Sequence, residues 1–285
     1  SFERVIGILN GTTNYILTRM FREGCSYEAA LKSAQELGYA ERDPSSDVEG
    51  LDAARKIAIL ARLAFGADVK LEDVQRMGIS ALSEDDIRLA MRMNCTIKLV
   101  AGAVAQEKGV SVFVRPAFVE LGHPLASVGG VFNALFLSGD CSGELMLYGR
   151  GAGARPTASS VAGDIIEICR NIAAGSSSPR IRQSGAGGPG ALPAGELWCG
   201  YCIRMTVEDR PRVLEGVAGA FGANCVSLRS VVQTPLGEGE AELILICHPH
   251  READIKRSLK ELEGRDYVKN LRSFMCLEAT KEDAL

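Results

Sequence analysis

Residues 175–195 are the feature that most constrains how this chain can fold. Six Gly, four Ser and three Pro fall within these 21 residues, and no hydrophobic period continues through them. Such a composition is typical of a flexible linker. It leaves 174 residues before it and 90 after it, and each part is long enough to bury a core of its own. Two domains are therefore predicted, residues 1–174 and 196–285.

The composition excludes several classes of protein. Of the 285 residues, 46% are hydrophobic and 24% are charged, which is a globular balance rather than a disordered one. The 32 Lys and Arg are offset by 36 Asp and Glu, so no basic surface is expected for nucleic acid or for a membrane. The longest uncharged stretch, residues 121–139, contains Pro124 and four Gly and cannot form a spanning helix. Small molecules and protein partners remain.

Two features indicate the cellular context. Nine irregularly spaced Cys favour reduced thiols in the cytoplasm over a disulfide framework. The chain opens at Ser1 with neither an initiator Met nor a signal-peptide pattern, so we expect a fragment of a longer protein.

The first domain is predicted to be α+β, with most of its helices ahead of its sheet. Hydrophobic periods and turn residues predict a strand at 4–9 and helices that end near residues 22, 37, 65, 93 and 174. The third of these helices is expected to start after Asp47. Four adjacent strands of a mostly antiparallel or mixed sheet are predicted at 96–105, 110–118, 131–137 and 144–148. The second of these strands carries one charge, Arg115, and needs a partner at any exposed edge.

The second domain has a compact alternating pattern. Strands are predicted at 197–207, 225–234, 241–247 and 267–277, with helices at 212–221 and 252–262. The resulting order βαββαβ is that of a ferredoxin-like unit.

Residues 34–56 gather acidic side chains into a turn and the first turns of a helix. Asp52 and Lys56 are four residues apart, so they share one face of that helix. Acidic residues that favour a helix N-terminus, together with an exposed ion pair, would account for the pattern without any chemistry.

The spacing within this segment supports a more specific reading. Its defined positions are Ala34-xxx-Gly38-Tyr39-Ala40-xx-Asp43-Pro44-xx-Asp47-Val48-x-Gly50-x-Asp52-xxx-Lys56. The segment resembles the signature of the homoserine dehydrogenases, and two further motifs, at 7–17 and 149–159, follow the family's order. The resemblance covers the chain apart from the linker. It implies NAD- or NADP-dependent reduction of L-aspartate 4-semialdehyde to L-homoserine, in threonine and methionine biosynthesis.

The resemblance also implies roles for single residues. Lys56 is the expected proton donor to the new alcohol oxygen, and Asp52 is expected to orient it. Glu41 and Asp47 are implied in binding the ammonium group of the substrate. Three residues at a predicted helix N-terminus would either bind substrate or only cap the helix, namely Asn10, Thr12 and Thr13.

Gly149, Gly151 and Gly153 are expected, by resemblance, to lie against the nicotinamide of the cofactor. Taken alone, this glycine spacing is a weak dinucleotide motif, because no acidic residue follows on a second strand. The domain that binds most of the NAD or NADP would precede Ser1, and a chain without it is expected to be inactive alone. A non-catalytic amino-acid-binding regulator is the alternative.

Two cysteine patterns suggest other chemistry and are interpreted as structural. Residues 198–202, Trp-Cys-Gly-Tyr-Cys, are similar to the redox motif of thioredoxins, but a strand rather than a helix is predicted to continue from them. Cys247 and His248 could join this pair in a zinc site, but adjacent residues at the end of a strand point apart. No metal is expected.

The second domain resembles an ACT domain, which implies feedback by an amino acid, with threonine the expected effector. The effector is expected at Asp209, Arg212 and Asn224, and Arg212 stands where the family pattern has Gly. The resemblance and the edges of the sheet favour a homodimer or a higher homo-oligomer.

Overall fold

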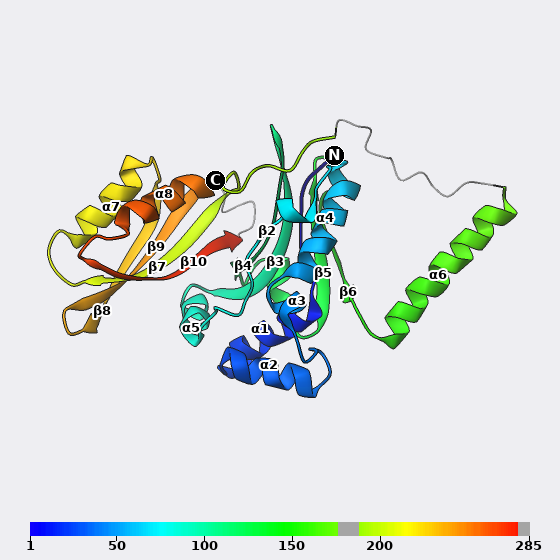
Figure 1. The fold of residues 1–285 in the computed structure, drawn as a ribbon, viewed down its shortest axis with the longest axis horizontal. Helices are drawn as coiled ribbons and strands as arrows, with labels where there is room; N and C mark the ends of the chain where they lie inside the picture. Colours follow the sequence, from blue (N-terminus) through cyan, green and yellow to red (C-terminus); the bar gives the residue numbers. More distant parts are fainter. Residues whose placement is uncertain (176–187, 279–285) are drawn as a thin grey trace. The chain divides into compact units, whose positions relative to one another are not determined.

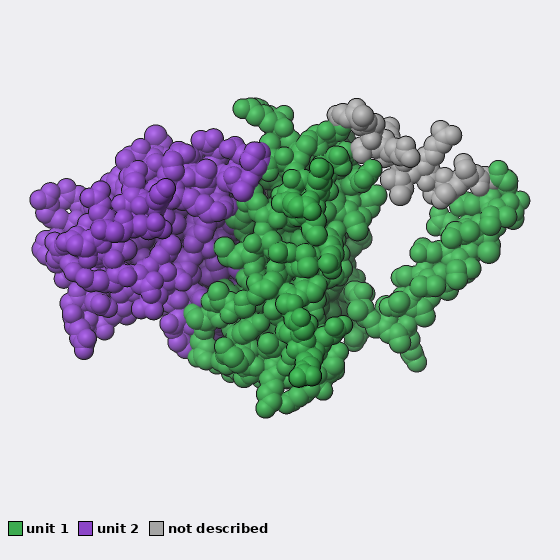
Figure 2. Space-filling model, in the orientation of Figure 1, with its two compact units in different colours: residues 1–84, 98–115, 124–192 green, residues 85–97, 116–123, 193–285 purple. Residues whose placement is uncertain are grey.

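The computed structural model describes residues 1–175 and 188–278, which form two compact units (Figures 1 and 2). Unit 1 comprises residues 1–84, 98–115 and 124–192, and unit 2 comprises 85–97, 116–123 and 193–285. Unit 2 therefore takes two short segments from the chain ahead of the predicted linker. Residues 176–187, most of that linker, lie outside the described residues. Within the described ranges, no helix is long and apolar enough to cross a membrane.

Capping residues and glycines set the ends of the first helices. Helix α1 (Gly11–Glu23) begins at Asn10, whose side chain accepts a backbone N–H, and ends at Gly24 in the left-handed conformation. Helix α2 (Tyr27–Glu36) begins in the same way at Ser26. Both helices lie where the sequence predicts them.

The third predicted helix, expected to start after Asp47, begins later, and a separate short helix precedes it. Helix α3 (Ser45–Val48) and helix α4 (Leu51–Phe65) are separated by Gly50, whose φ is 75°. A left-handed residue cannot continue a right-handed helix, so the chain turns there before α4 begins. The later helical segments of the first part of the chain are η1 (Leu71–Asp73), α5 (Glu84–Arg92), η2 (Pro124–Ser127) and α6 (Ala154–Ala173).

The sheet of unit 1 corrects the prediction that the four later strands are adjacent. Its strands are β1 (Phe2–Ile8), β2 (Gln75–Arg76), β3 (Cys95–Gln106), β4 (Gly109–Glu120), β5 (Phe132–Gly139) and β6 (Gly143–Arg150), with β3 and β4 also giving residues to unit 2. The strand order is β6-β5-β1-β3-β4, and β2 pairs with β4 in parallel. Strand β1 is fully buried from Val5 to Ile8, so it needs a neighbour on each side, and it pairs antiparallel with β5 and β3.

The free edge of the sheet of unit 1 is formed by β6 and not by β4, the strand with the single charge. Strand β4, which contains Arg115, is buried along nearly its whole length and has neighbours on both sides. Strand β6 ends the order instead, and most of its residues are exposed.

Unit 2 has the predicted order βαββαβ. Its elements are β7 (Trp198–Glu208), α7 (Val213–Ala223), β8 (Leu228–Gly237), β9 (Glu240–Arg251), α8 (Glu252–Leu262) and β10 (Val268–Glu278). The strands are antiparallel in the order β10-β7-β9-β8, which is the ferredoxin-like arrangement. Residues 117–119 of β4, which belong to unit 2, pair in parallel with β10.

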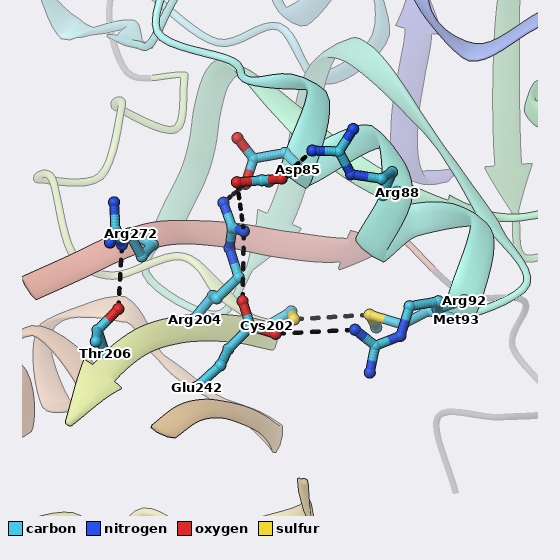
Figure 3. Close-up of polar contacts among 10 residues, drawn as sticks. Asp85, Arg88, Arg92, Met93, Cys202, Arg204, Thr206, Glu242 and Arg272 are labelled. Atoms are coloured by element: carbon cyan, nitrogen blue, oxygen red, sulfur yellow. Dashed lines mark hydrogen bonds and ion pairs between the residues drawn. The ribbon is translucent and has the colours of Figure 1, made fainter. Parts of the chain in front are cut away.

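Unit 2 buries one arginine among carboxylates (Figure 3). Arg204 on β7 is 6% exposed, and its Nη2 donates to Oδ1 of Asp86 on α5 at 2.9 Å. Its Nη1 lies 3.5 Å from Glu242 on β9 and 3.7 Å from Asp85. A buried guanidinium is costly unless anions accompany it, so these contacts fix α5 against the strands of unit 2.

Replacing Asp86 with Ala is expected to lower the free energy of unfolding of unit 2 by about 3–5 kcal/mol, because Arg204 then stays buried without its nearest carboxylate. Asp85→Ala is the matched control, since that side chain is 57% exposed and its loss should cost less than about 1 kcal/mol. Urea unfolding followed by fluorescence of Trp198, the single Trp, measures both. Equal losses in the two variants would contradict the assignment.

Candidate active site

Strand β1 leads into Asn10 at the start of α1. Asn10 is buried, and its Oδ1 accepts the N–H of Thr13 at 2.9 Å. The next residue, Gly11, lies so close to neighbouring backbone that a Cβ atom there would be 2.8 Å from the carbonyl oxygen of Val131. Glycine is therefore required at this position, and the start of α1 is held in one place.

The amide nitrogen of Asn10 joins two carboxylates. Its Nδ2 donates to Oδ1 of Asp47 at 2.7 Å and to Oδ2 of Asp52 at 3.0 Å. An amide carries two N–H donors, so both hydrogen bonds form at once. Asp47 is on α3 and Asp52 is in the first turn of α4, so one side chain positions three elements relative to one another.

Lys56 lies one turn after Asp52 on the same face of α4, as predicted. Its Nζ donates to Oδ2 of Asp52 at 2.6 Å and to the carbonyl oxygen of Leu9 at 2.9 Å. The side chains of Lys56 and Asp52 are 45% and 30% exposed. The contact with Leu9 directs the ammonium towards the junction of β1 and α1, which an ordinary surface ion pair does not explain.

The other predicted substrate residues differ in their surroundings. The Thr13 hydroxyl lies 3.0 Å from Oδ1 of Asn10, and the Thr12 hydroxyl donates to the carbonyl oxygen of Tyr39 at 2.7 Å. The side chain of Glu41 is exposed and forms no hydrogen bond or ion pair with the part of the chain that the structure describes. The residues gathered into one cluster are Asn10, Asp47, Asp52 and Lys56.

Sequence reasoning missed a buried lysine beside α1. Lys98 on β3 is 3% exposed, and its Nζ donates to the carbonyl oxygen of Val128 at 2.6 Å and to Oδ1 of Asn14 at 3.2 Å. Asn14 in turn donates to the carbonyl oxygen of Phe132 at 3.0 Å, so the lysine helps to join α1 to β3 and β5. Burial, with a smaller effect of Arg22, lowers the pKa of Lys98 to about 8. The sequence did carry one signal for this residue, because Lys98 is the single charged residue in an otherwise mostly apolar predicted strand.

The glycine-rich segment runs from β6 into α6. Gly149 lies in β6, and Gly153, with a φ of 126°, directly precedes α6. A Cβ atom on Gly151 would collide with the side chain of Asn133 on β5. The Oδ1 atom of Asn133 is buried and has no hydrogen-bond partner among the described residues. The alternation of polar and apolar residues along β5 does not distinguish Asn133 from its neighbours in the sequence.

The predicted effector residues of unit 2 do not converge. Asp209 accepts a hydrogen bond from Gln233 at 2.9 Å, and Arg212, with a φ of 75°, directly precedes α7 and pairs with Glu215. Asn224 follows the last residue of the same 11-residue helix. Only Asp209 and Arg212 therefore lie at the turn between strand and helix.

The cysteines at 199 and 202 lie along β7, and no helix follows them directly. Because they are three residues apart on a strand, Cys199 and Cys202 point to opposite faces. The Sγ of Cys202 lies 3.7 Å from the Sδ of Met93 (Figure 3). In the described ranges, no group of three or more His, Cys, Asp or Glu is arranged to hold a metal ion.

Comparison with known proteins gives consistent matches. The family model described as homoserine dehydrogenase matches residues 1–166. The homoserine dehydrogenase of Synechocystis sp. is 42% identical over 279 residues, which are 95% of this chain and 64% of that protein. The one from Bacillus subtilis is 38% identical over 95% of this chain and 63% of its own length. This chain therefore spans less than two thirds of these relatives.

A solved structure matches over almost the whole chain. The structure of a homoserine dehydrogenase from Thiobacillus denitrificans has a TM-score of 0.89 and 33% sequence identity. The match covers 98% of this chain and 64% of that one.

Stability should rise with pH through the titration of Lys98. Its pKa of about 8 in the folded state is below its usual 10.5, so the unfolded chain binds more protons between these values. The free energy of unfolding is expected to gain roughly 3 kcal/mol from pH 7 to pH 11, and below pH 8 the full cost of burying the charge remains. Urea unfolding of the wild type and of Lys98→Met at both pH values isolates this gain, because the other titrating groups are common to both.

The matched control is Lys108→Met, an exposed lysine in the turn between β3 and β4, which should keep the pH dependence of the wild type. If Lys98→Met also kept that pH dependence, the titration assigned to Lys98 would be wrong.

Proposed function

The chain belongs to the homoserine dehydrogenase family, and from this membership we propose that it binds L-aspartate 4-semialdehyde and supplies the proton for its reduction to L-homoserine. The observation that carries the proposal is the Asn10 amide that holds Asp47 and Asp52 beside Lys56. These residues come from a helix start and two further helices and meet in one partly exposed cluster. Because this chain spans 64% of its Synechocystis relative, the proposal assigns it substrate binding and proton donation rather than the complete reaction.

Lys56 is the proposed proton donor. Addition of hydride to an aldehyde carbon leaves a negatively charged oxygen that must take a proton. The Lys56 ammonium has three donors, of which two are directed to Asp52 and to the Leu9 carbonyl oxygen. The third remains for the substrate oxygen, and Asp52 holds the ammonium in position.

The charge of the cluster suits the amino group of the substrate. Two carboxylates, Asp47 and Asp52, accompany one ammonium, Lys56, so the cluster carries a net charge of −1 when all three are ionised. A substrate ammonium would restore the balance and donate hydrogen bonds to the remaining oxygen lone pairs of Asp47. Glu41, whose side chain is exposed, would add a second carboxylate to this binding.

NAD or NADP is the proposed cofactor, and the described residues fit its nicotinamide end. The buried Oδ1 of Asn133 is an acceptor without a partner among the described residues, beside Gly151, and a carboxamide N–H would satisfy it. Gly149 and Gly153 have no side chains that would cover the backbone on either side of Gly151. The bound cofactor supplies the hydride.

Most of the cofactor would be held by a domain outside this chain. Helix α6 has no buried residue, and apolar side chains including Ile165, Ile168 and Ile172 are more than half exposed. A covering domain would remove this apolar surface from water.

Lys56→Ala and Asp52→Asn are expected to lower turnover by about 10²–10⁴-fold in a full-length enzyme that carries a nucleotide-binding domain, because each removes part of the proton-donating pair. The assay is NAD(P)H oxidation with aspartate 4-semialdehyde. Lys70→Ala, at an exposed lysine ahead of η1, is the control and should leave turnover unchanged. Near-normal rates in both active-site variants would contradict the proposal.

The 285-residue chain alone is expected to be inactive in the same assay.

Unit 2 would act as an ACT domain that binds an amino acid, with threonine as the effector. Its βαββαβ order and its β10-β7-β9-β8 sheet support this proposal. The chain would work in the cytoplasm, because nine irregularly spaced cysteines favour reduced thiols over a disulfide framework. A homodimer or a higher homo-oligomer would cover Leu145, Leu147 and Tyr148, which the edge strand β6 exposes.

Arg212→Gly is expected to strengthen threonine binding roughly fivefold or more, because Gly adopts a φ of 75° without strain and opens the N-terminus of α7 to a carboxylate. Calorimetric titration of threonine measures the change. Arg212→Ala separates the two causes, since it removes the bulk but keeps the strained backbone. Loss of binding in the Gly variant would show instead that Arg212 itself binds the carboxylate.

A further inference from the structure

Two thiols meet on neighbouring strands of unit 2. The Sγ of Cys199 on β7 lies 3.0 Å from the Sγ of Cys276 on β10. Cys199 is partly exposed, whereas Cys276 is 3% exposed.

The strand register explains why Cys199 meets Cys276 rather than Cys202. Cys276 is paired with Tyr201 across the antiparallel strands, and Cys199 precedes Tyr201 by two residues. Residues two apart on a strand share a face, so both thiols lie on the same side of the sheet as diagonal neighbours. Cys202 is on the other face, beside Met93.

We propose that Cys199 and Cys276 form a reversible disulfide when the protein meets a disulfide oxidant of the glutathione class. The partly exposed Cys199 thiolate attacks one sulfur of the oxidant, forming a mixed disulfide and releasing one thiol. Cys276 then attacks the Cys199 sulfur, and the second thiol leaves. The two protein thiols lose two electrons and two protons in total, and the oxidant is reduced to two thiols.

The disulfide would tie β10 to β7 at the place where β10 also pairs with β4. Cys276 is in register with Ala117 of β4, and both residues belong to unit 2. The link would close a loop whose ends are 77 residues apart in sequence. Such a constraint acts on the unfolded chain, so oxidation is expected to raise the thermal midpoint of unit 2.

The test is to incubate the folded 285-residue chain with oxidised glutathione, block the remaining thiols with an alkylating reagent, and map the linked peptides by mass spectrometry. Trypsin combined with chymotrypsin is used, because cleavage after Tyr201 separates Cys199 from Cys202. The expected product joins Cys199 to Cys276 with a mass loss of about 2 Da, and dithiothreitol removes it.

Variants decide between the possible links. Cys276→Ser and Cys199→Ser should each abolish the product, whereas Cys202→Ala should keep it. The Cys199 variant changes the more exposed thiol, so its result stands even if the buried Cys276→Ser variant folds poorly. A link from Cys199 to Cys202, or a glutathione adduct that persists on Cys199 without resolution by Cys276, would overturn the proposal.

Discussion

The candidate active-site cluster depends on the hydrogen bonds of one amide side chain. Asn10 accepts the Thr13 N–H through Oδ1 and donates through Nδ2 to Asp47 and Asp52. The Oδ1 end faces a hydrogen-bond donor and the Nδ2 end faces two acceptors. The surroundings therefore determine the orientation of the amide. An aspartate would match the shape of Asn10 but would present an anion to two carboxylates. The cluster therefore requires a side chain that both accepts and donates at this buried position.

The two units stabilise a buried cation in different ways. Arg204 in unit 2 cannot lose its proton, so carboxylates from α5 and β9 must accompany it. Lys98 in unit 1 is hydrogen-bonded to a backbone carbonyl and to Asn14, both neutral. A lysine tolerates such surroundings because it can become neutral, and its pKa is lowered to about 8 accordingly. The choice of cation thus follows from the partners available at each site.

Local sequence patterns predicted the elements better than their arrangement. Caps such as Asn10 and the order βαββαβ depend on neighbouring residues, and the structure confirms both. The placement of β1 between β5 and β3 depends on pairing between distant segments, which no local pattern encodes. The sequence shows only a glycine at position 50. The left-handed φ of this glycine is needed because the chain turns between α3 and α4, and that turn depends on where the two helices pack.

The same distinction holds for the candidate site. Helical spacing predicted that Asp52 and Lys56 share a face, and the structure confirms it. The bonds from Asn10 bridge 37 and 42 residues of sequence, and spacing cannot predict them. Asn133 was missed for a similar reason, since it stands out only through the close approach of Gly151, which directly follows β6.

The partial exposure of the Lys56–Asp52 pair bears on how such a cluster could act. In water, an exposed pair of this kind contributes less than about 1 kcal/mol, because solvent screens both charges. Covering by substrate and cofactor would exclude that solvent and strengthen every charge interaction in the cluster. The hydrogen bonds from Asn10 and to Leu9 already hold the charged groups in place, so little reorganisation would accompany that change. In the proposed function, the open cluster would contribute little to stability, and covering it would strengthen its charge interactions without changing its geometry.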